Sequence, residues 1–325
     1  MTAIETRDLT RYYGDLCAVD HLDLRVERGE LYAFLGPNGA GKTTTIRMLT
    51  GLIRPSEGQA WLDGLDLATD PLGVKARVGV VPQRSNLYGE LSARDNLLFM
   101  AKLYGLRRRE WQRRAEELLD EFGLGDGADT PFAALSGGMK RRLTIAAALV
   151  HRPAILFLDE PTTGLDVQAS RGLRRVIADL RSQGVTVFLT THLIHEAELL
   201  ADRVAIIVRG QLVAVDTPAA LRQRCQSETL LELDVPTADP ALLAALQESA
   251  VIQRATRSGE HITLVADSIE AGLRAALDVM EARGVALRGA RSVTPTLEDA
   301  FVQLTNLDPE TMRNGMSNNQ GGGKA

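Results

Sequence analysis

Five short apolar segments recur along the first two thirds of the chain, and each has the length of a buried β-strand. The stretches between them carry apolar residues at the period of an α-helix. Strands that alternate with helices in this way pair in parallel within one sheet. The five segments are ELYAFLG at 30–36, RVGVVPQ at 77–83, AILFLDEP at 154–161, VTVFLTTH at 185–192 and RVAIIVRG at 203–210. The pattern predicts an α/β fold with a mostly parallel central sheet.

The pattern changes over residues 91–150, where three helical stretches follow one another without a convincing strand. This segment is therefore predicted to be a helical subdomain inserted into the α/β domain. Its basic run at 107–114, RRREWQRR, could form a nucleic-acid patch. A solvated helix face is the favoured interpretation, because the run holds one aromatic residue and Glu116 and Glu117 follow it.

A second pattern begins after residue 218, with shorter elements in the order β-α-β-β-α-β. This order is typical of a ferredoxin-like α+β domain, a common fold that says little about function. We therefore expect a first domain over 1–218, an accessory domain over 219–305 and a disordered tail over 306–325. The tail ends in NGMSNNQGGGKA, a polar and glycine-rich sequence.

The amino-acid composition indicates which classes of protein the chain can belong to. The 45% hydrophobic and 24% charged residues are those of a soluble globular protein, and the net charge of −5 argues against a dedicated nucleic-acid binder. Cys17 and Cys225 form no CxxC pair, so neither a zinc site nor a disulfide framework is indicated and a reducing cytoplasm fits. The N-terminus has no signal-peptide layout, and every apolar run falls short of the ~18 residues of a membrane span.

The segment GPNGAGKTT between the first predicted strand and a helix matches the phosphate-binding pattern G-x-x-x-x-G-K-[ST]. Backbone N–H groups from residues 38–44 are expected to surround nucleotide phosphates, aided by the helix dipole. We expect Lys42 to neutralise β- and γ-phosphate oxygens and Thr43 to bind Mg²⁺. A glycine-rich turn with an exposed lysine is the alternative. The predicted nucleotide-binding residues of this loop are Gly36, Pro37, Asn38, Gly39, Ala40, Gly41, Lys42, Thr43 and Thr44.

The apolar segment ILFLDEP ends in two adjacent carboxylates, Asp159 and Glu160, which should lie at the carboxyl edge of the sheet. Alone they could mark an ordinary strand end. Together with the phosphate loop they predict a nucleoside triphosphatase, in which Asp159 binds Mg²⁺ and Glu160 orients or deprotonates the attacking water.

A second anion-binding helix start is indicated by LSGGMKRRL at 135–143. A chain with one complete phosphate loop does not need another for the same nucleotide. The motifs GPNGAGKTT, VVPQ, LSGGMKRR, ILFLDEPTTGLD and TTHLIHEAE, in this order, resemble the nucleotide-binding subunits of ATP-binding-cassette (ABC) transporters over residues 2–218.

The resemblance implies roles for further residues. Gln83 would contact Mg²⁺ and water and couple to the membrane partner, and His192 would contact the γ-phosphate. Asp166 would belong to a loop that crosses a dimer interface. The resemblance also implies a signature segment at Ser136, Gly137 and Gly138, and an adenine-stacking aromatic at Tyr13.

Each of these roles has a simpler alternative. Gln83 could be a strand-end amide, His192 a loop histidine and Asp166 a helix N-cap. His195 competes for the histidine role, but it falls inside the next predicted helix.

The tyrosine role is open as well, because Tyr12 could replace Tyr13 or either could simply pack in a hairpin. Met139 departs from the family pattern, which usually has glutamine there, and ATPase activity is expected to survive the change.

The resemblance implies that two copies of the chain close over two ATP molecules, with Ser136 and the following helix facing a γ-phosphate held by the partner's Lys42. The segment TPTLEDAFVQLT at 294–305 further resembles the ends of ATPase subunits of daunorubicin-resistance-type exporters. A separate membrane permease and a place at the cytoplasmic face of the membrane are thereby expected.

Two other functions compete with that of an exporter ATPase. A soluble ABC-type ATPase acting on nucleic acid or ribosomes is disfavoured, because every motif occurs once and no long coiled coil or zinc cysteines separate Lys42 from Ser136. A nonhydrolytic scaffold is disfavoured because Glu160 and His192 are both present.

Overall fold

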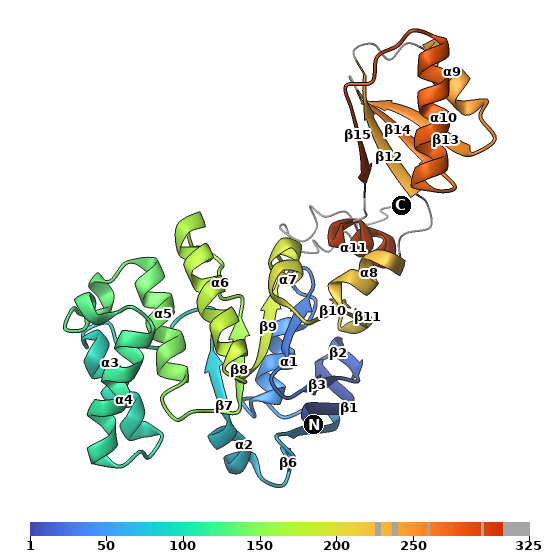
Figure 1. Ribbon diagram of the computed structural model, residues 1–325. Coiled ribbons are helices and arrows are strands. Elements are labelled where there is room, and N and C mark those ends of the chain that lie inside the picture. Colours follow the sequence, from blue (N-terminus) through green and yellow to red (C-terminus); the bar gives the residue numbers. More distant parts are fainter. Residues whose placement is uncertain (225–228, 236–239, 259–260, 294–295, 308–325) are drawn as a thin grey trace, which may run out of the picture. The chain divides into compact units, whose positions relative to one another are not determined.

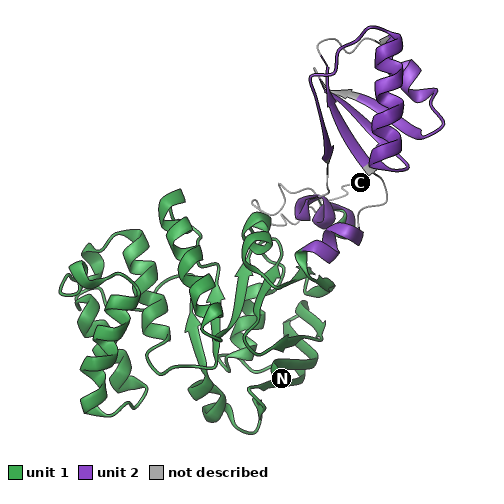
Figure 2. Cartoon of the chain, viewed as in Figure 1, with its two compact units in different colours: residues 1–218, 304–325 green, residues 219–303 purple. Residues whose placement is uncertain are grey.

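The computed structural model describes residues 1–224, 229–235, 240–258, 261–293 and 296–307. The chain divides into two compact units, Met1–Pro218 with Leu304–Ala325, and Ala219–Gln303 (Figure 2). Apart from residues 306 and 307, the tail that was expected to be disordered lies outside the described residues. Within the described part of the chain, no helix combines the length and apolarity needed to cross a membrane.

The first unit contains a six-stranded sheet in the order β11-β10-β4-β9-β8-β7 (Figure 1). Neighbouring strands are parallel except β11 (Gln211–Asp216), which pairs antiparallel with β10 at the edge. All five strands predicted from the apolar segments are confirmed. They are β4 (Leu31–Leu35), β7 (Val78–Val81), β8 (Ile155–Asp159), β9 (Thr186–Thr191) and β10 (Arg203–Val208).

This sheet is buried on both faces, which explains why its strands are continuous apolar runs rather than alternating ones. In β8, Leu156 and Leu158 pack into a cluster that includes the helical subdomain, whereas Phe157 belongs to a second cluster on the other face. The ring of Phe157 lies 5.4 Å from that of Phe188 in β9. Two cores therefore fix the sheet from both sides and hold its carboxyl edge in place.

The first unit also contains an antiparallel sheet that the sequence analysis did not predict. Its order is β2-β1-β5-β6, with β3 paired to β1. The long strand β1 has register shifts at Leu9 and Arg11, so its buried positions do not alternate regularly and the period of two is obscured. The strands are β1 (Thr2–Tyr13), β2 (Leu16–Leu22), β3 (Arg25–Glu27), β5 (Glu57–Leu62) and β6 (Leu65–Asp66).

Residues 91–150, predicted to be a helical subdomain, contain helices and form no strand, and only an isolated bridge joins Ser92 to Pro131. The helices of the subdomain are α3 (Ala93–Leu103), α4 (Arg108–Glu121) and α5 (Gly137–Ala148), with 3₁₀ turns at Gly125–Gly127 and Phe132–Ala134. The remaining helices of the first unit are α1 (Lys42–Leu49), α2 (Pro71–Arg77), α6 (Val167–Ser182) and α7 (Ile194–Leu200).

The second unit contains a four-stranded antiparallel sheet in the order β13-β14-β12-β15. The chain order of its elements is β-α-β-β-α-β, so the predicted ferredoxin-like arrangement is confirmed. Leu231 and Leu233 of β12 pack with Leu242, Leu246 and Met280 of the two helices. The elements are β12 (Thr229–Asp234), α9 (Pro240–Gln247), β13 (Ile252–Ser258), β14 (His261–Ala266), α10 (Ile269–Ala282) and β15 (Gly289–Val293), flanked by α8 (Pro218–Arg224) and α11 (Leu297–Thr305).

Candidate active site

The loop between β4 and α1 has the backbone that a phosphate-binding loop needs. At Gly36, a Cβ atom would lie 2.3 Å from the carbonyl oxygen of Ile207. At Gly41, φ is 104° and a Cβ atom would lie 2.5 Å from the carbonyl oxygen of Ala18. Only glycine fits either position. Gly41 is the N-cap of α1 and makes no side-chain hydrogen bond to the first turn, so the turn's N–H groups suit an anion.

The side chain of Lys42 lies along this loop and is 5% exposed. Its Nζ donates to the carbonyl oxygens of Gly36 at 2.7 Å and Pro37 at 3.0 Å, and it lies 3.3 Å from Oε1 of Glu160. Burial lowers the pKa of Lys42, while the charge of Glu160 acts in the opposite direction. The alternative of an exposed lysine on a glycine-rich turn is therefore wrong.

Thr43 and Asp159 bring oxygen atoms together beside the lysine. The Thr43 hydroxyl donates to Oδ2 of Asp159 at 3.0 Å. The other carboxylate oxygen, Oδ1, accepts a 2.6 Å hydrogen bond from Thr190 at the end of β9. A hydroxyl beside a carboxylate that is held by a second hydroxyl is an oxygen donor set suited to a hard cation such as Mg²⁺. These residues therefore fit the metal role expected of Thr43 and Asp159.

Glu160 follows the last residue of β8 and occupies a strained left-handed conformation, with φ of 45°. Its backbone N–H donates to the carbonyl oxygen of Thr190 at 3.1 Å, which holds the turn against the neighbouring strand. A non-glycine residue in this conformation persists only where its surroundings impose it. The turn thereby points the Glu160 carboxylate at the loop that carries Lys42.

Side chains from two other strand ends reach the same carboxylate. Nε2 of Gln83, after β7, donates to Oε2 of Glu160 at 3.3 Å, and the hydroxyl of Thr163 donates to the same oxygen at 3.2 Å. Nδ1 of His192, directly after β9, lies 3.2 Å from this oxygen. That nitrogen is at ion-pair distance but is not aligned for a hydrogen bond. Gln83 and His192 therefore both lie against the Glu160 carboxylate.

The charge state of Glu160 follows from these neighbours. Burial by itself would raise the pKa of the carboxyl group, but His192 and Lys42 favour the ionised form and hold the pKa at about 2. Glu160 is consequently a carboxylate at neutral pH. His195 lies inside α7, as expected from the sequence, and has no contact of this kind among the described residues.

The signature segment begins a helix, as predicted, at a separate place in the first unit. Ser136 is the N-cap of α5, and its Oγ accepts from the N–H of Met139 at 3.3 Å. Among the described residues, no hydrogen bond joins Ser136 to the phosphate loop. A Cβ atom on Gly138 would lie 3.1 Å from Cβ of Ala169 in α6, so the two helix starts pack closely.

Asp166 and the two tyrosines also lie apart from the Glu160 cluster. Asp166 is the N-cap of α6 and accepts from the N–H of Ala169 at 2.8 Å, which is the structural alternative noted for it. Tyr13 lies opposite Leu16 in the hairpin of β1 and β2, and the Arg11 guanidinium lies 4.8 Å from its ring. Tyr12 is exposed to a similar extent in the same hairpin.

Arg141 was not singled out from the sequence. Arg141 is 7% exposed, and its guanidinium donates to the carbonyl oxygens of Pro82, Asp159 and Pro161, at 2.6, 3.0 and 2.7 Å. The helical period of α5 could have drawn attention to it. Arg141 lies one helical turn before Thr144 and Ile145, which are both buried, so it falls on the buried face of the helix, where a charged residue is unusual.

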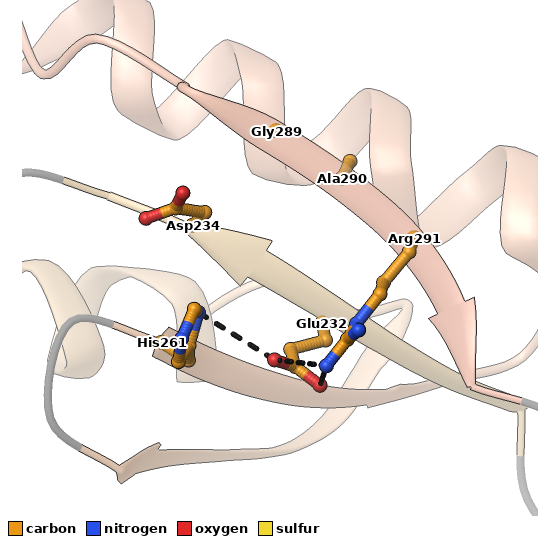
Figure 3. Close-up of a pocket in the computed structure, with 6 residues that line it drawn as sticks. All are labelled: Glu232, Asp234, His261, Gly289, Ala290 and Arg291. Carbon is orange, nitrogen blue, oxygen red and sulfur yellow. Dashed lines mark hydrogen bonds and ion pairs between the residues drawn. The ribbon is translucent and has the colours of Figure 1, made fainter.

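The second unit has a cavity of about 370 Å³ on its sheet, lined by Glu232, Asp234, His261, Gly289, Ala290 and Arg291. Figure 3 shows Glu232 of β12 with Arg291 of β15 and His261 of β14 on either side. Both carboxylate oxygens of Glu232 lie 2.8 Å from the Arg291 guanidinium, and His261 lies at 3.5 Å. None of the predicted site residues lines this cavity. Among the described residues, no three His, Cys, Asp or Glu side chains gather where they could hold a metal ion.

Comparison with known proteins agrees with the site in the first unit. The family described as ABC transporter matches residues 19–163. The linearmycin resistance ATP-binding protein LnrL of Bacillus subtilis is 34% identical over 304 residues, which cover 93% of this chain and 98% of LnrL. The daunorubicin/doxorubicin resistance ATP-binding protein DrrA of Streptomyces peucetius is 45% identical over 228 residues, which cover 70% of this chain and 69% of DrrA.

A solved structure supports the same assignment. It is a dimeric ATP-binding cassette in a post-hydrolysis state, bound to ADP and Pi, with a TM-score of 0.60 and 25% identity over 66% of this chain and 98% of that one. The phosphate loop, the carboxylates at the end of β8 and the similarity over nearly the whole chain agree with one another. The chain belongs to the ATP-binding subunits of ABC transporters and is an ATPase of that family.

Proposed function

We propose that this chain powers an exporter by closing with a second copy around two ATP molecules and driving a separate membrane permease. The observation that carries the proposal is the convergence of Lys42, Gln83 and His192 on Glu160, while Ser136 begins a helix elsewhere in the unit. A site that hydrolyses ATP is thus separate from an anion-binding helix start that a second chain can use.

ATP binding would change the surroundings of Glu160. The β- and γ-phosphates attract Lys42 and draw its charge away from Oε1 of Glu160. The pKa of Glu160 then rises from the value of about 2 that Lys42 and His192 impose. Nucleotide itself would therefore make Glu160 a better proton acceptor for the water that attacks the γ-phosphorus.

The other side chains of the site have positioning roles in this mechanism. Gln83 holds Glu160 and orients the water, and His192 donates to the γ-phosphate. Thr43, Asp159 and the Gln83 amide oxygen would hold Mg²⁺, which neutralises phosphate charge when it is bound.

The remaining nucleotide contacts would come from exposed segments. The adenine base stacks on Tyr13 or its neighbour Tyr12, both of which present partly exposed rings. Ser136 and the N–H groups at the start of α5 face the γ-phosphate held by the partner copy, and Asp166 lies at the interface beside them. The dimeric state of the ADP-bound relative supports this arrangement.

Two exposed aromatic side chains that follow Gln83 in the sequence support a permease partner. Tyr88 and Phe99 are 51% and 37% exposed, and their rings pack edge to face with centroids 5.0 Å apart. Exposed aromatic rings of this kind suit a protein interface. Export is proposed because the relatives LnrL and DrrA are resistance proteins, and the chain would then act at the cytoplasmic face of the membrane.

The test is the assembly state of the Glu160→Gln variant. Sedimentation with and without ATP and Mg²⁺ is expected to show an ATP-dependent dimer, since binding is retained and hydrolysis is blocked. A monomer at saturating ATP would contradict the proposal. Co-purification from membranes with a polytopic protein is expected as well, whereas recovery on ribosomes or nucleic acid instead would favour a soluble ATPase.

A further inference from the structure

Arg141 occupies the second turn of α5, the helix that Ser136 begins. Its guanidinium donates hydrogen bonds to four backbone carbonyl groups, two of them after β7 and two at the end of β8 or just after it. None of these groups is another residue of α5. The guanidinium therefore connects the signature helix to backbone segments of the hydrolytic site within the same chain.

The positions of these carbonyl groups are specific. Pro82 directly precedes Gln83, and the Gln83 carbonyl oxygen itself lies 3.4 Å from Nη1 of Arg141. Asp159 and Pro161 lie on either side of Glu160, whose φ of 45° is the strained point of the turn. Backbone strain of this kind needs neighbouring contacts to maintain it. Arg141 supplies contacts on both sides of the strained residue.

Arg141 remains charged in this buried place. Burial lowers its pKa to about 10, while Asp159 and Glu196 act in the opposite direction. The planar fork matters as much as the charge, because it reaches several carbonyl oxygens at fixed angles. A lysine has a single ammonium nitrogen and cannot reproduce all of these hydrogen bonds.

We propose that Arg141 is a positioning residue for ATP hydrolysis, which holds the backbone of Gln83 and Glu160 in place and joins both to the signature helix of the same chain. The inference rests on the proposed role of Glu160. Because α5 begins at the segment that would contact the partner's nucleotide, a shift of this helix would move the turn that carries Glu160. Arg141 thus couples the nucleotide held by the partner copy to ATP hydrolysis at Glu160 of its own chain.

The neighbouring Arg142 provides a matched control. It lies on the same helix, but its guanidinium donates to the carbonyl oxygen of Phe122 inside the helical subdomain, at 3.0 Å. The experiment uses the full chain with Arg141→Met, Arg141→Lys, Arg142→Met and Arg142→Lys. For each variant, the ATP Kd is measured by fluorescence, kcat by phosphate release and Tm by thermal unfolding.

For Arg141→Met we expect kcat to fall at least about tenfold and the ATP Kd to stay within about threefold, because misplacement of a reacting group affects turnover more than binding. Arg141→Lys should recover part of the lost turnover. The Arg142 variants should keep the kcat of the parent chain even where their Tm falls.

Unchanged kcat in both Arg141 variants would overturn the inference, and so would a loss that the Arg142 variants match at equal Tm. If Arg141→Met does not fold, the test is the kcat of Arg141→Lys compared with that of Arg142→Lys at equal Tm. A parent chain whose hydrolysis does not depend on Glu160 would instead overturn the proposed function together with the inference.

Discussion

Lys42 and Glu160 form a buried ion pair, with Nζ of the lysine 3.3 Å from Oε1 of the glutamate. The pair joins the phosphate loop to the turn after β8. In the proposed mechanism, Lys42 binds phosphate and Glu160 activates water, and without nucleotide the two side chains hold each other. Nucleotide binding would then release Glu160 from Lys42 and so make it a better base.

Replacing Glu160 by glutamine tests this relationship directly. Glu160→Gln should slow hydrolysis by about 100-fold or more, because the variant lacks the proton acceptor. ATP affinity should be retained or should rise, since Lys42 no longer has a competing anion. Steady-state turnover and ATP binding are the measurements. Near-normal turnover would show that another group accepts the proton of the attacking water.

Acid should remove part of the stability that this ion pair provides. The pKa of Glu160 is about 2 in the folded chain, against an ordinary value of 4.5. Between these values the unfolded chain binds more protons, so stability rises with pH across this window and is lost as pH falls toward 2. Glu160→Gln should weaken this dependence.

The measurement is urea unfolding of the nucleotide-free protein across that pH range. It is followed by the fluorescence of Trp61 and Trp111, which both lie in the first unit. Equal pH dependence in the parent chain and in Glu160→Gln would contradict the expected role of the lowered pKa.

Mixed dimers test whether each ATP is shared between two chains. A Lys42→Ala chain retains its signature segment, and a Ser136→Arg chain retains its phosphate loop. Each variant alone should be inactive, whereas a mixed dimer has one intact composite site. An equimolar mixture should recover roughly a quarter of parent activity, since random pairing makes half of the dimers mixed. No recovery at any mixing ratio would indicate hydrolysis within a single chain.

The geometry of the phosphate loop predicts a contrast between two glycines. Both Gly39 and Gly41 have positive φ, but a Cβ atom on Gly39 meets nothing within 4 Å, whereas one on Gly41 meets the Ala18 carbonyl oxygen. Gly39→Ala should therefore lower the free energy of unfolding only by the backbone strain of about 1–2 kcal/mol. Gly41→Ala should lower the free energy of unfolding further and should also weaken ATP binding by displacing Lys42. Thermal unfolding and ATP titration of both variants provide the comparison, and equal losses would contradict it.

The sequence alone determined the parts of this protein that depend on local pattern. A strand buried on both faces must be apolar throughout, so the five strands of the parallel sheet were visible as uninterrupted runs. The phosphate loop was equally clear, because its glycines and its lysine act within nine consecutive residues. Asp159 and Glu160 could be assigned to the carboxyl edge because the first ends such a strand and the second follows it.

Only the tertiary structure decided which side chains meet. Gln83, Glu160 and His192 are far apart in the chain, and their contacts depend on the order in which β7, β8 and β9 pair. The hydrogen-bond acceptors of Arg141 are backbone carbonyl groups. Every residue has such a group, so a sequence pattern cannot reveal which ones Arg141 contacts. The bulges of β1 obscured the antiparallel sheet for a related reason, since pairing with β2 and β5 overrides the local alternation there.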